Sequence, residues 1–276
     1  MIPKTIHYCW LSNDPIPEEF QKYIKGWHDI LKGYEFIKWD FSRFPKNSSI
    51  WVQEAFDNKK YAFAADYIRL YAVYNYGGIY MDMDIEVLKA FDELLDAPYM
   101  FAKERASDPW IEAGCFGAEK GNEFVGKCLD RYKDRHFTKN DGSFDQLPLP
   151  QIMEKVRNEN KISLQLYPWT YFTAKSYDTG IECPTGETYA IHHFAGSWKT
   201  TEEIKVIEAT QKYSRIFGHR VGHNIAEFQA KAKCEGFRGI VQLTKEKLAR
   251  KIGGGVQESS NSAVLSLRRH AWMFAA

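Results

Sequence analysis

The sequence predicts an α/β fold, in which a Rossmann-like sheet is flanked by helices and followed by a helical C-terminal appendage. Strand-like, helical and strand-like segments follow each other over residues 5–39, which is the order that opens such a sheet. A buried-type helix then leads through two glycines into a further strand. The predicted division is a ligand-binding domain of residues 1–200 and a charged, helical appendage of residues 201–276, whose low-complexity end is expected to form a flexible tail.

Composition excludes several classes of protein. The 276 residues carry 37 Lys and Arg against 36 Asp and Glu, so the balance of charge argues against nucleic-acid binding. The five cysteines are scattered and form no Cys-x-x-Cys pair, which indicates reduced thiols and a cytoplasmic location. The sequence shows no signal-like start and no apolar run near the roughly 20 residues that span a bilayer. We therefore expect a soluble or peripheral protein.

The first predicted strand, over residues 5–10, ends in Trp10 and is followed by the turn-forming sequence Ser-Asn-Asp-Pro. Ligands bind at the carboxyl ends of the strands in parallel sheets. Trp10 is therefore placed either to stack on a nucleotide base or to fill the core. A helix over residues 17–31 and a second strand over residues 34–39 are predicted to follow.

The helix predicted over residues 59–76 is apolar nearly all round, which is typical of a buried helix. Asp66 and Arg69 lie three residues apart on one of its faces, where a charge is costly unless it is paired or meets a ligand. Either they form an ion pair that tolerates burial, or Arg69 meets an anion while Asp66 accepts hydrogen bonds from hydroxyl groups. We favour the second interpretation, because Gly77 and Gly78 end the helix beside an acidic strand.

Residues 77–87 alternate strictly between apolar and polar side chains, which predicts one continuous strand with a buried apolar face. The polar set is Tyr80, Asp82, Asp84 and Glu86. Its carboxylates repel one another unless a cation lies among them, and Mg²⁺, Mn²⁺ and Ca²⁺ prefer carboxylate oxygens and can bridge to a phosphate. The alternative is an edge strand with a solvated acidic face, because Asp-x-Asp is a short pattern.

The middle of the chain predicts further alternation, with strands over 99–102 and 163–174, helices over 122–135 and 151–158, and a loop over 139–150. Residues 110–121 mix small residues with β-formers, which favours a strand passing close to a ligand. Glu112 in this segment is either a third carboxylate of the acidic site or a solvated turn residue.

The stretch 189–198 predicts a strand that carries His192 and His193 into a Gly-Ser-Trp turn. Neighbouring strand residues face opposite ways, so only one of the two can join the acidic site directly. Imidazole is a good ligand for Mn²⁺, and one His with one or two Asp leaves coordination positions open for a phosphate. The alternative is a pair of ordinary strand histidines.

The appendage differs in charge from the rest of the chain. Residues 201–276 carry 13 Lys and Arg against 7 Asp and Glu, whereas residues 1–200 are acidic overall. Its helices are predicted over 202–217, 224–235 and 244–252. This basic character suits either an anionic membrane surface or a solvated helical unit.

Four segments in this order, residues 2–10, 62–69, 74–86 and 192–198, resemble glycosyltransferase family 32. The family includes bacterial capsular-polysaccharide and lipopolysaccharide transferases and the fungal initiating α-1,6-mannosyltransferases. The resemblance covers residues 1–200 and leaves the appendage out. It implies a GT-A fold, a donor sugar linked to UDP or GDP, a divalent cation, Mn²⁺ or Mg²⁺, and retention of the anomeric configuration.

The resemblance also implies roles for single residues in holding the cation. Asp82 is expected to contact the donor's ribose and the cation, and Asp84 to ligate the cation at the diphosphate. His192, rather than His193, is similar to the family's C-terminal metal ligand.

The other implied roles concern the donor. Asp66 and Arg69 are similar to the pair that holds the donor sugar and its phosphate, and Trp10 is expected to lie against the base. Trp198, with Ser197 beside it, is expected to close over the diphosphate. The sequence Leu-Ser-Asn-Asp after Trp10 departs from the family, where many relatives have glycines, and leaves the loop contacts open.

The implied function is a retaining, metal-dependent glycosyltransferase acting on a glycan or lipid-linked glycan acceptor in capsule or lipopolysaccharide synthesis. A glycoside hydrolase would need two carboxylates on separate elements, whereas Asp82 and Asp84 are predicted on one strand. A non-catalytic, metal-dependent binder of sugars or nucleotides is the alternative outside enzymes. We expect the protein to be cytoplasmic, with a peripheral contact to the inner face of the membrane through the basic appendage.

Overall fold

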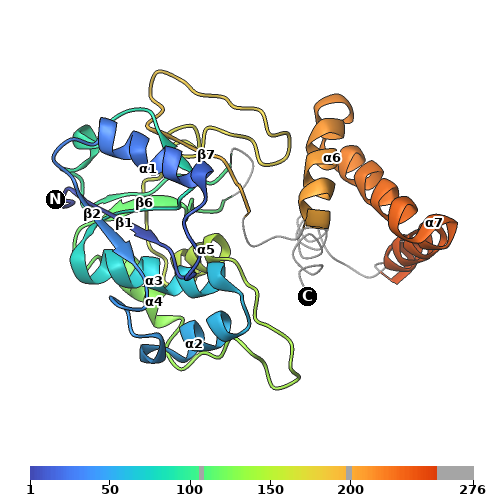
Figure 1. Ribbon diagram of the computed structural model, residues 1–276, viewed down its shortest axis with the longest axis horizontal. Coiled ribbons are helices and arrows are strands. Elements are labelled where there is room, and N and C mark those ends of the chain that lie inside the picture. The colour runs from blue at the N-terminus through green and yellow to red at the C-terminus, as the bar shows by residue number, and fades with distance from the viewer. Residues whose placement is uncertain (106–108, 197–200, 254–276) are drawn as a thin grey trace. The chain divides into compact units, whose positions relative to one another are not determined.

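The computed structural model describes residues 1–105, 109–196 and 201–253. These residues fall into two compact units, shown in Figure 1. Unit 1 consists of Met1–Ser176 and Glu182–Ala195, and unit 2 consists of Tyr177–Ile181 and the chain from Gly196 onward. The candidate site belongs to unit 1.

Unit 1 is built on a five-stranded mixed sheet with the order β2-β1-β3-β6-β5. Its strands are β1 (Thr5–Cys9), β2 (Glu35–Trp39), β3 (Gly78–Met81), β5 (Tyr99–Met100) and β6 (Cys115–Ala118). β1 runs parallel to β2 and β3, whereas β6 runs antiparallel to β3 and β5. The carboxyl ends of the three parallel strands therefore share one edge of the sheet, as the predicted α/β fold requires. The predicted fold class is confirmed.

Helices cover both faces of this sheet. In Figure 1, α1 (Glu18–Ile30) lies on one face and α3 (Tyr61–Tyr76) and α4 (Glu123–Asp130) lie on the other. α2 (Ile50–Asp57) packs on α3, and α5 (Leu149–Glu159) packs on α4. Two short 3-10 turns, Lys46–Ser48 and Asp92–Leu94, complete the helical elements of this unit. The core between the layers is apolar and rich in buried aromatic rings.

The joint between α3 and β3 depends on two glycines. α3 ends where the Gly77 N–H donates to the Val73 carbonyl at 2.9 Å, and Gly77 and Gly78 have φ values of 69° and 105°. A Cβ atom at Gly77 would lie 2.8 Å from the Lys120 backbone nitrogen, and one at Gly78 would lie 2.6 Å from the Thr5 carbonyl oxygen. Positive φ and this close packing both require glycine. The predicted helix end at these residues is confirmed.

The acidic segment after this joint is not the continuous strand that the alternation predicts. β3 ends at Met81, and the chain turns through residues 82–84 before β4 (Ile85–Val87) begins. β4 leaves the large sheet and pairs antiparallel with β7 (Ala190–His192). The turn forms because β3 and β4 have different partners, and it is closed by the Ile85 N–H donating to the Asp82 carbonyl at 3.1 Å. The prediction of one strand over residues 77–87 is therefore wrong.

Two other strand predictions are corrected by the structure. Residues 163–174 form turns with a single bridge, between Ala102 and Tyr167, in place of a strand. Within 110–121, only β6 is a strand, and the segment before it reaches the site as irregular backbone. Both segments contain aromatic or small residues that are buried in the core. Their composition therefore resembles that of a strand, although the backbone does not form one.

Unit 2 is a helical hairpin of α6 (Thr201–Phe217) and α7 (His219–Gly253). The helices approach closely where Gly222 faces Ser214, since a Cβ on Gly222 would lie 2.5 Å from the Ser214 backbone nitrogen. α7 is one long helix, whereas the sequence predicts two helices over this part of the chain, at 224–235 and 244–252. Among the described residues, no helix combines the length and apolar character needed to cross a bilayer.

Candidate metal and donor site

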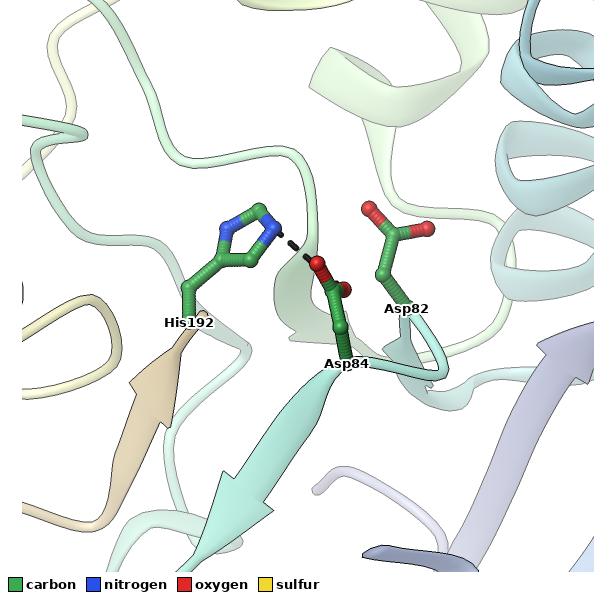
Figure 2. Close-up of side chains that lie close together, drawn as sticks. All are labelled: Asp82, Asp84 and His192. Atoms are coloured by element: carbon green, nitrogen blue, oxygen red, sulfur yellow. Dashed lines mark ion pairs between the residues drawn. The ribbon is translucent and has the colours of Figure 1, made fainter. Parts of the chain in front are cut away.

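Three side chains converge at the edge of the large sheet. Asp82 follows β3, Asp84 precedes β4, and His192 is the last residue of β7. Figure 2 shows the imidazole of His192 turned toward Asp84, with Asp82 on the far side of the turn. His192 Nε2 lies 3.5 Å from Asp84 Oδ1, and one ligand atom from each of the three residues lies within 4.8 Å of the others. The turn at 82–84 thus brings two carboxylates to a histidine that is distant in sequence.

Each carboxylate of this group has at least one oxygen held by a hydrogen bond from the protein. Asp84 Oδ2 accepts a hydrogen bond from the Ala195 N–H at 2.7 Å, and Asp82 Oδ1 accepts one from the Tyr80 hydroxyl at 2.8 Å. The Asp82 backbone N–H donates to the Gly114 carbonyl at 2.7 Å. These bonds hold the side chains in place, so their remaining oxygens keep a defined direction.

Arg69 of α3 connects this group to Asp66. Its Nη1 lies 3.3 Å from Asp82 Oδ2 and donates to the Ala113 carbonyl at 2.8 Å, while its Nη2 lies 3.2 Å from Asp66 Oδ1. The guanidinium group also lies 4.7 Å from the centre of the Tyr80 ring. Asp66 and Arg69 therefore form the ion pair of the first interpretation, and the same arginine also reaches the acidic turn, whereas nothing in the structure tests the favoured interpretation. Burial raises the pKa of Asp66 to about 7, although Arg69 acts in the opposite direction.

Glu112 stands behind His192. Its Oε1 lies 3.1 Å from His192 Nδ1, on the opposite side of the ring from Asp84. Although desolvation opposes it, the carboxylates of Glu112 and Asp84 raise the pKa of His192 to about 10. Desolvation, together with the charge of Asp84, raises the pKa of Asp82 against the effect of Arg69. Without a cation, the protein thus balances its carboxylates with Arg69 and a protonated His192.

The donor set fits a divalent cation. Two carboxylates and one imidazole are a ligand set that suits Mn²⁺ and, through the oxygens, Mg²⁺. Position 114 beside the site leaves little room for a side chain. A Cβ at Gly114 would lie 2.6 Å from His192 Cε1 and 2.9 Å from Asp82 Oδ2. A cation would also relieve the repulsion between Asp82 and Asp84, which are two residues apart.

Trp10 lies at the same edge of the sheet, after the carboxyl end of β1. It lines a cavity of about 470 Å³ with the loop 11–16 and with Lys38 and residues 40–42 after β2. Its indole Nε1–H donates to the Asp14 carbonyl at 2.7 Å, and its ring meets Phe20 edge to face. The loop that departs from the family's glycines is therefore the wall of this cavity. Hydrogen bonding to Ser42 lowers the pKa of Asp40 to about 2, so the cavity carries a carboxylate.

The two adjacent histidines have separate surroundings. His193 Nε2 lies 2.8 Å from Glu86 Oε2, its Nδ1 lies 3.3 Å from Lys175 Nζ, and its ring stacks on Tyr23 at 5.0 Å. The structure therefore brings His192, and not His193, to Asp82 and Asp84. Glu86 belongs to the His193 group. Ser197 and Trp198 lie outside the described residues.

Sequence reasoning missed two contributions to this site and left a third, that of Glu112, open between a carboxylate of the acidic site and a solvated turn residue. Tyr80 holds Asp82, the Ala195 N–H holds Asp84, and Glu112 bonds to His192. The alternation of residues 77–87 does place Tyr80 on the face of Asp82, and that signal could have identified it. The other two depend on pairings between segments far apart in sequence, which carry no local pattern. The assignments of individual residues as ligands or catalytic groups stay predictions.

Comparison with known proteins agrees with the motifs. Residues 17–101, which include Asp66, Arg69, Asp82 and Asp84, match the family described as "Glycosyltransferase sugar-binding region containing DXD motif". Over these residues the chain is similar to this glycosyltransferase family. This match confirms the resemblance to family 32 that the four segments predict. The relatives of the chain are named as glycosyltransferases, which agrees with the predicted enzyme class.

The chain is similar to proteins from two yeasts and from a virus. Inositol phosphoceramide mannosyltransferase 3 of Schizosaccharomyces pombe is 32% identical over 128 residues, covering 45% of this chain and 35% of that protein. Mannosyl phosphorylinositol ceramide synthase SUR1 of Saccharomyces cerevisiae is 33% identical over 143 residues, covering 50% and 36%. Uncharacterized glycosyltransferase L373 of Acanthamoeba polyphaga mimivirus is 35% identical over 107 residues, covering 37% and 43%. The chain thus matches less than half of the length of each of these relatives.

Solved structures give weaker likenesses. The PaToxG glycosyltransferase is 19% identical with a TM-score of 0.43, covering 58% of this chain and 70% of that one. The apo-form glycosyltransferase GlyE of Streptococcus pneumoniae TIGR4 is 14% identical with a TM-score of 0.42, covering 81% and 62%. Similarities at this level carry no argument about the site.

Proposed function

We propose that the chain is a retaining, metal-dependent glycosyltransferase, which moves a sugar from a nucleotide-sugar donor to a hydroxyl group of an acceptor. The observation that carries this proposal is the convergence of Asp82, Asp84 and His192, with ligand atoms within 4.8 Å of one another, beside the guanidinium group of Arg69. A site that concentrates carboxylates, one imidazole and an arginine is suited to a cation and a diphosphate together.

Asp82, Asp84 and His192 would hold the cation, for which Mn²⁺ or Mg²⁺ is proposed. Bound there, such an ion supplies Lewis-acid chemistry, which neutralises negative charge on the departing diphosphate. The protein contributes the fixed directions of the ligands, through Tyr80 at Asp82 and the Ala195 N–H at Asp84.

Arg69 is proposed to stabilise the same negative charge, because its guanidinium group is held at the edge of the acidic turn. Asp66 keeps Arg69 oriented and accepts hydrogen bonds from the donor sugar's hydroxyl groups in this proposal. Trp10 and the cavity of about 470 Å³ beside it are proposed to receive the base of the nucleotide.

The proposed reaction needs no nucleophile from the enzyme. The bond between the anomeric carbon and the phosphate oxygen breaks, and its electron pair stays on that oxygen. The acceptor hydroxyl oxygen forms the new bond to the anomeric carbon on the same face, and its proton passes to the leaving phosphate. Retention and same-face attack are proposed on the family resemblance.

Donor and acceptor are proposed from the relatives. The names of the two yeast relatives describe transfer of mannose and an inositol phosphoceramide acceptor, so a mannosyl donor and a glycan or glycolipid acceptor are the first to test. These names do not support capsule or lipopolysaccharide synthesis in particular, and that narrower role stays a prediction. The peripheral membrane contact of the basic appendage also stays a prediction.

The test is hydrolysis and transfer from UDP- and GDP-linked sugars, with Mn²⁺ and after its removal by a chelator. Turnover is expected only with the metal. Because metal stabilisation of a transition state contributes several kcal/mol, Asp84→Ala is expected to lower kcat by about 10³-fold or more. Asp29→Ala, at an exposed position of α1, serves as the matched control and is expected to retain turnover.

Two outcomes would contradict the proposal. Tight, metal-dependent binding of a nucleotide sugar without turnover of any donor would favour a non-catalytic binder. Full metal-dependent activity in Asp84→Ala would show that the cation is held elsewhere.

A further inference from the structure

Glu112 is a buried carboxylate whose oxygens are all engaged by donors. The residue is 1% exposed and lies on irregular backbone shortly before β6. Its Oε1 accepts the Gly114 N–H at 2.6 Å and its Oε2 accepts the Thr173 hydroxyl at 2.7 Å. The third partner is His192, whose Nδ1 lies 3.1 Å from Oε1. Burial of a carboxylate is costly, and these contacts from three segments of the chain compensate for it.

The position of Glu112 relative to His192 separates it from the metal ligands. Nδ1 of the imidazole faces Glu112, whereas Nε2 faces Asp84 at 3.5 Å. A carboxylate is an acceptor only, so the hydrogen on this side of the ring belongs to Nδ1. Nε2 is then the nitrogen that offers a lone pair toward Asp82 and Asp84 when a cation replaces its proton.

We propose that Glu112 is a positioning residue, which fixes the ring orientation and tautomer of His192 so that Nε2 is presented to the cation. The proposal rests on the metal site of the proposed function and deepens it. Glu112 does not touch the cation. It acts through His192, and Gly114 and Thr173 in turn keep its carboxylate in place.

A charged partner has an effect that a neutral acceptor lacks. A carboxylate that accepts the Nδ1–H of a metal-bound imidazole increases the basicity of the ligating nitrogen as well as orienting it. Replacement by glutamine keeps the side-chain volume and one oxygen acceptor, while its amide group can donate to the Thr173 hydroxyl. Replacement by alanine removes both the charge and the hydrogen bonds. The two variants therefore separate orientation from charge.

The experiment measures Mn²⁺ affinity by electron paramagnetic resonance on the purified chain, without donor or turnover. Loss of such a partner typically weakens metal binding by about 10- to 100-fold, which is expected for Glu112→Ala, with a smaller loss for Glu112→Gln. Glu154→Gln is the matched control, because Glu154 is also a buried carboxylate, 8% exposed, but hydrogen-bonds to Arg157 and Asn158 on α5. Its Mn²⁺ affinity is expected to equal that of the unmodified chain.

A double-mutant cycle with His192→Ala distinguishes positioning from ligation. If Glu112 acts only through His192, then Glu112→Gln is expected to cause no further loss of Mn²⁺ affinity once His192 is removed. A further loss in that background would make Glu112 a ligand and overturn the proposal. Glu112→Gln decides the matter if thermal unfolding shows that Glu112→Ala does not fold.

The outcomes for the two proposals differ. If the unmodified chain binds no Mn²⁺, the proposed metal site fails and this inference fails with it. If the unmodified chain binds Mn²⁺ and both Glu112 variants bind it equally well, the metal site stands and the positioning role alone is contradicted.

Discussion

Two histidines of unit 1, one buried and one partly buried, have opposite surroundings. His7 lies in β1 with no exposed surface, and its Nε2–H donates to the Gly77 carbonyl at 2.8 Å while its Nδ1 accepts from the Trp39 indole at 3.1 Å. His192 ends β7 with one nitrogen facing Glu112 and the other facing Asp84. Both rings have a partner at each nitrogen, but the partners of His7 are neutral and those of His192 are carboxylates.

The difference in partners reverses the effect of burial. Desolvation lowers the pKa of His7 below its ordinary value, so that this ring stays neutral. For His192, two carboxylates outweigh desolvation and raise the pKa to about 10. His7 therefore stabilises the junction between α3 and β3 at Gly77. His192 instead lies in a site whose carboxylates favour positive charge. Burial alone does not mark a functional histidine, whereas the charge of its partners does.

The largest effect that sharpens this contrast is expected at Arg69, the permanent cation of the acidic region. Arg69→Lys keeps the charge, but an ammonium group cannot reproduce the fork that contacts Asp66 and Asp82 together. Loss of a donor that stabilises a developing charge lowers kcat by about 10²- to 10³-fold, and a loss of this size is expected in the metal-dependent turnover assay.

Arg157→Lys is the matched control for this change. Arg157 also pairs with a carboxylate three residues earlier on its helix, Glu154, at 2.9 Å. Its replacement is expected to leave turnover unchanged. Unchanged turnover in Arg69→Lys as well would show that Arg69 merely forms an ion pair that tolerates burial.

A smaller effect is expected at Gly114, which lets backbone approach the acidic group. In Gly114→Ala the new Cβ would lie 2.6 Å from His192 Cε1 and 2.9 Å from an oxygen of Asp82, so these side chains must move. Since a displaced ligand geometry weakens a metal site much as the loss of a supporting contact does, Mn²⁺ affinity is expected to fall by about 10-fold or more.

Gly26→Ala provides the comparison for Gly114, because a Cβ at Gly26 meets nothing within 4 Å and Gly26 lies inside α1. Helix propensity predicts that this control raises stability by about 0.5–1 kcal/mol and leaves Mn²⁺ affinity unaltered. Equal Mn²⁺ affinity for the two alanine variants would contradict the close packing at the site.

The elements that sequence reasoning predicted well have strong local signals. Residues 59–76 are apolar nearly all round, and the structure shows α3 buried nearly all round and ending at Gly77. The order of β1, α1 and β2 followed from strand-forming residues bounded by turns, with a segment suited to a helix between them. In each case the hydrophobic period and the helix or turn signals agree, so the neighbouring residues alone determine the local structure.

The site was only partly predictable, because its geometry depends on long-range pairing. Alternation over residues 77–87 fits one strand as well as it fits two strands in different sheets, and the distant β7 decides between them. The same pairing selects His192 over His193, a choice that the sequence supported by resemblance alone. Glu112 was left open between a ligand and a turn residue. It is neither exposed nor near Asp82 in sequence, and its partners at Gly114, Thr173 and His192 come from three separate segments.

The smallest effect, and the one that isolates the other side of the comparison, is expected from the pH dependence of stability at His7. The pKa of His7 in the folded chain is below its ordinary value of 6.5, so the unfolded chain binds the proton first as the pH falls. Stability from neutral His7 is present above pH 6.5 and is lost as the pH falls through 6.5 toward the folded pKa.

His7→Gln removes this dependence, and at pH 7.5 the altered hydrogen bonding is expected to lower the free energy of unfolding by about 1–3 kcal/mol. Urea unfolding at pH 7.5 and pH 5.5 should therefore show a smaller difference for His7→Gln than for the unmodified chain and for His28→Gln, which changes an exposed histidine of α1. Mn²⁺ affinity at pH 7.5 is expected to be the same in all three, and equal pH differences in stability would show that His7 is not held neutral by its burial.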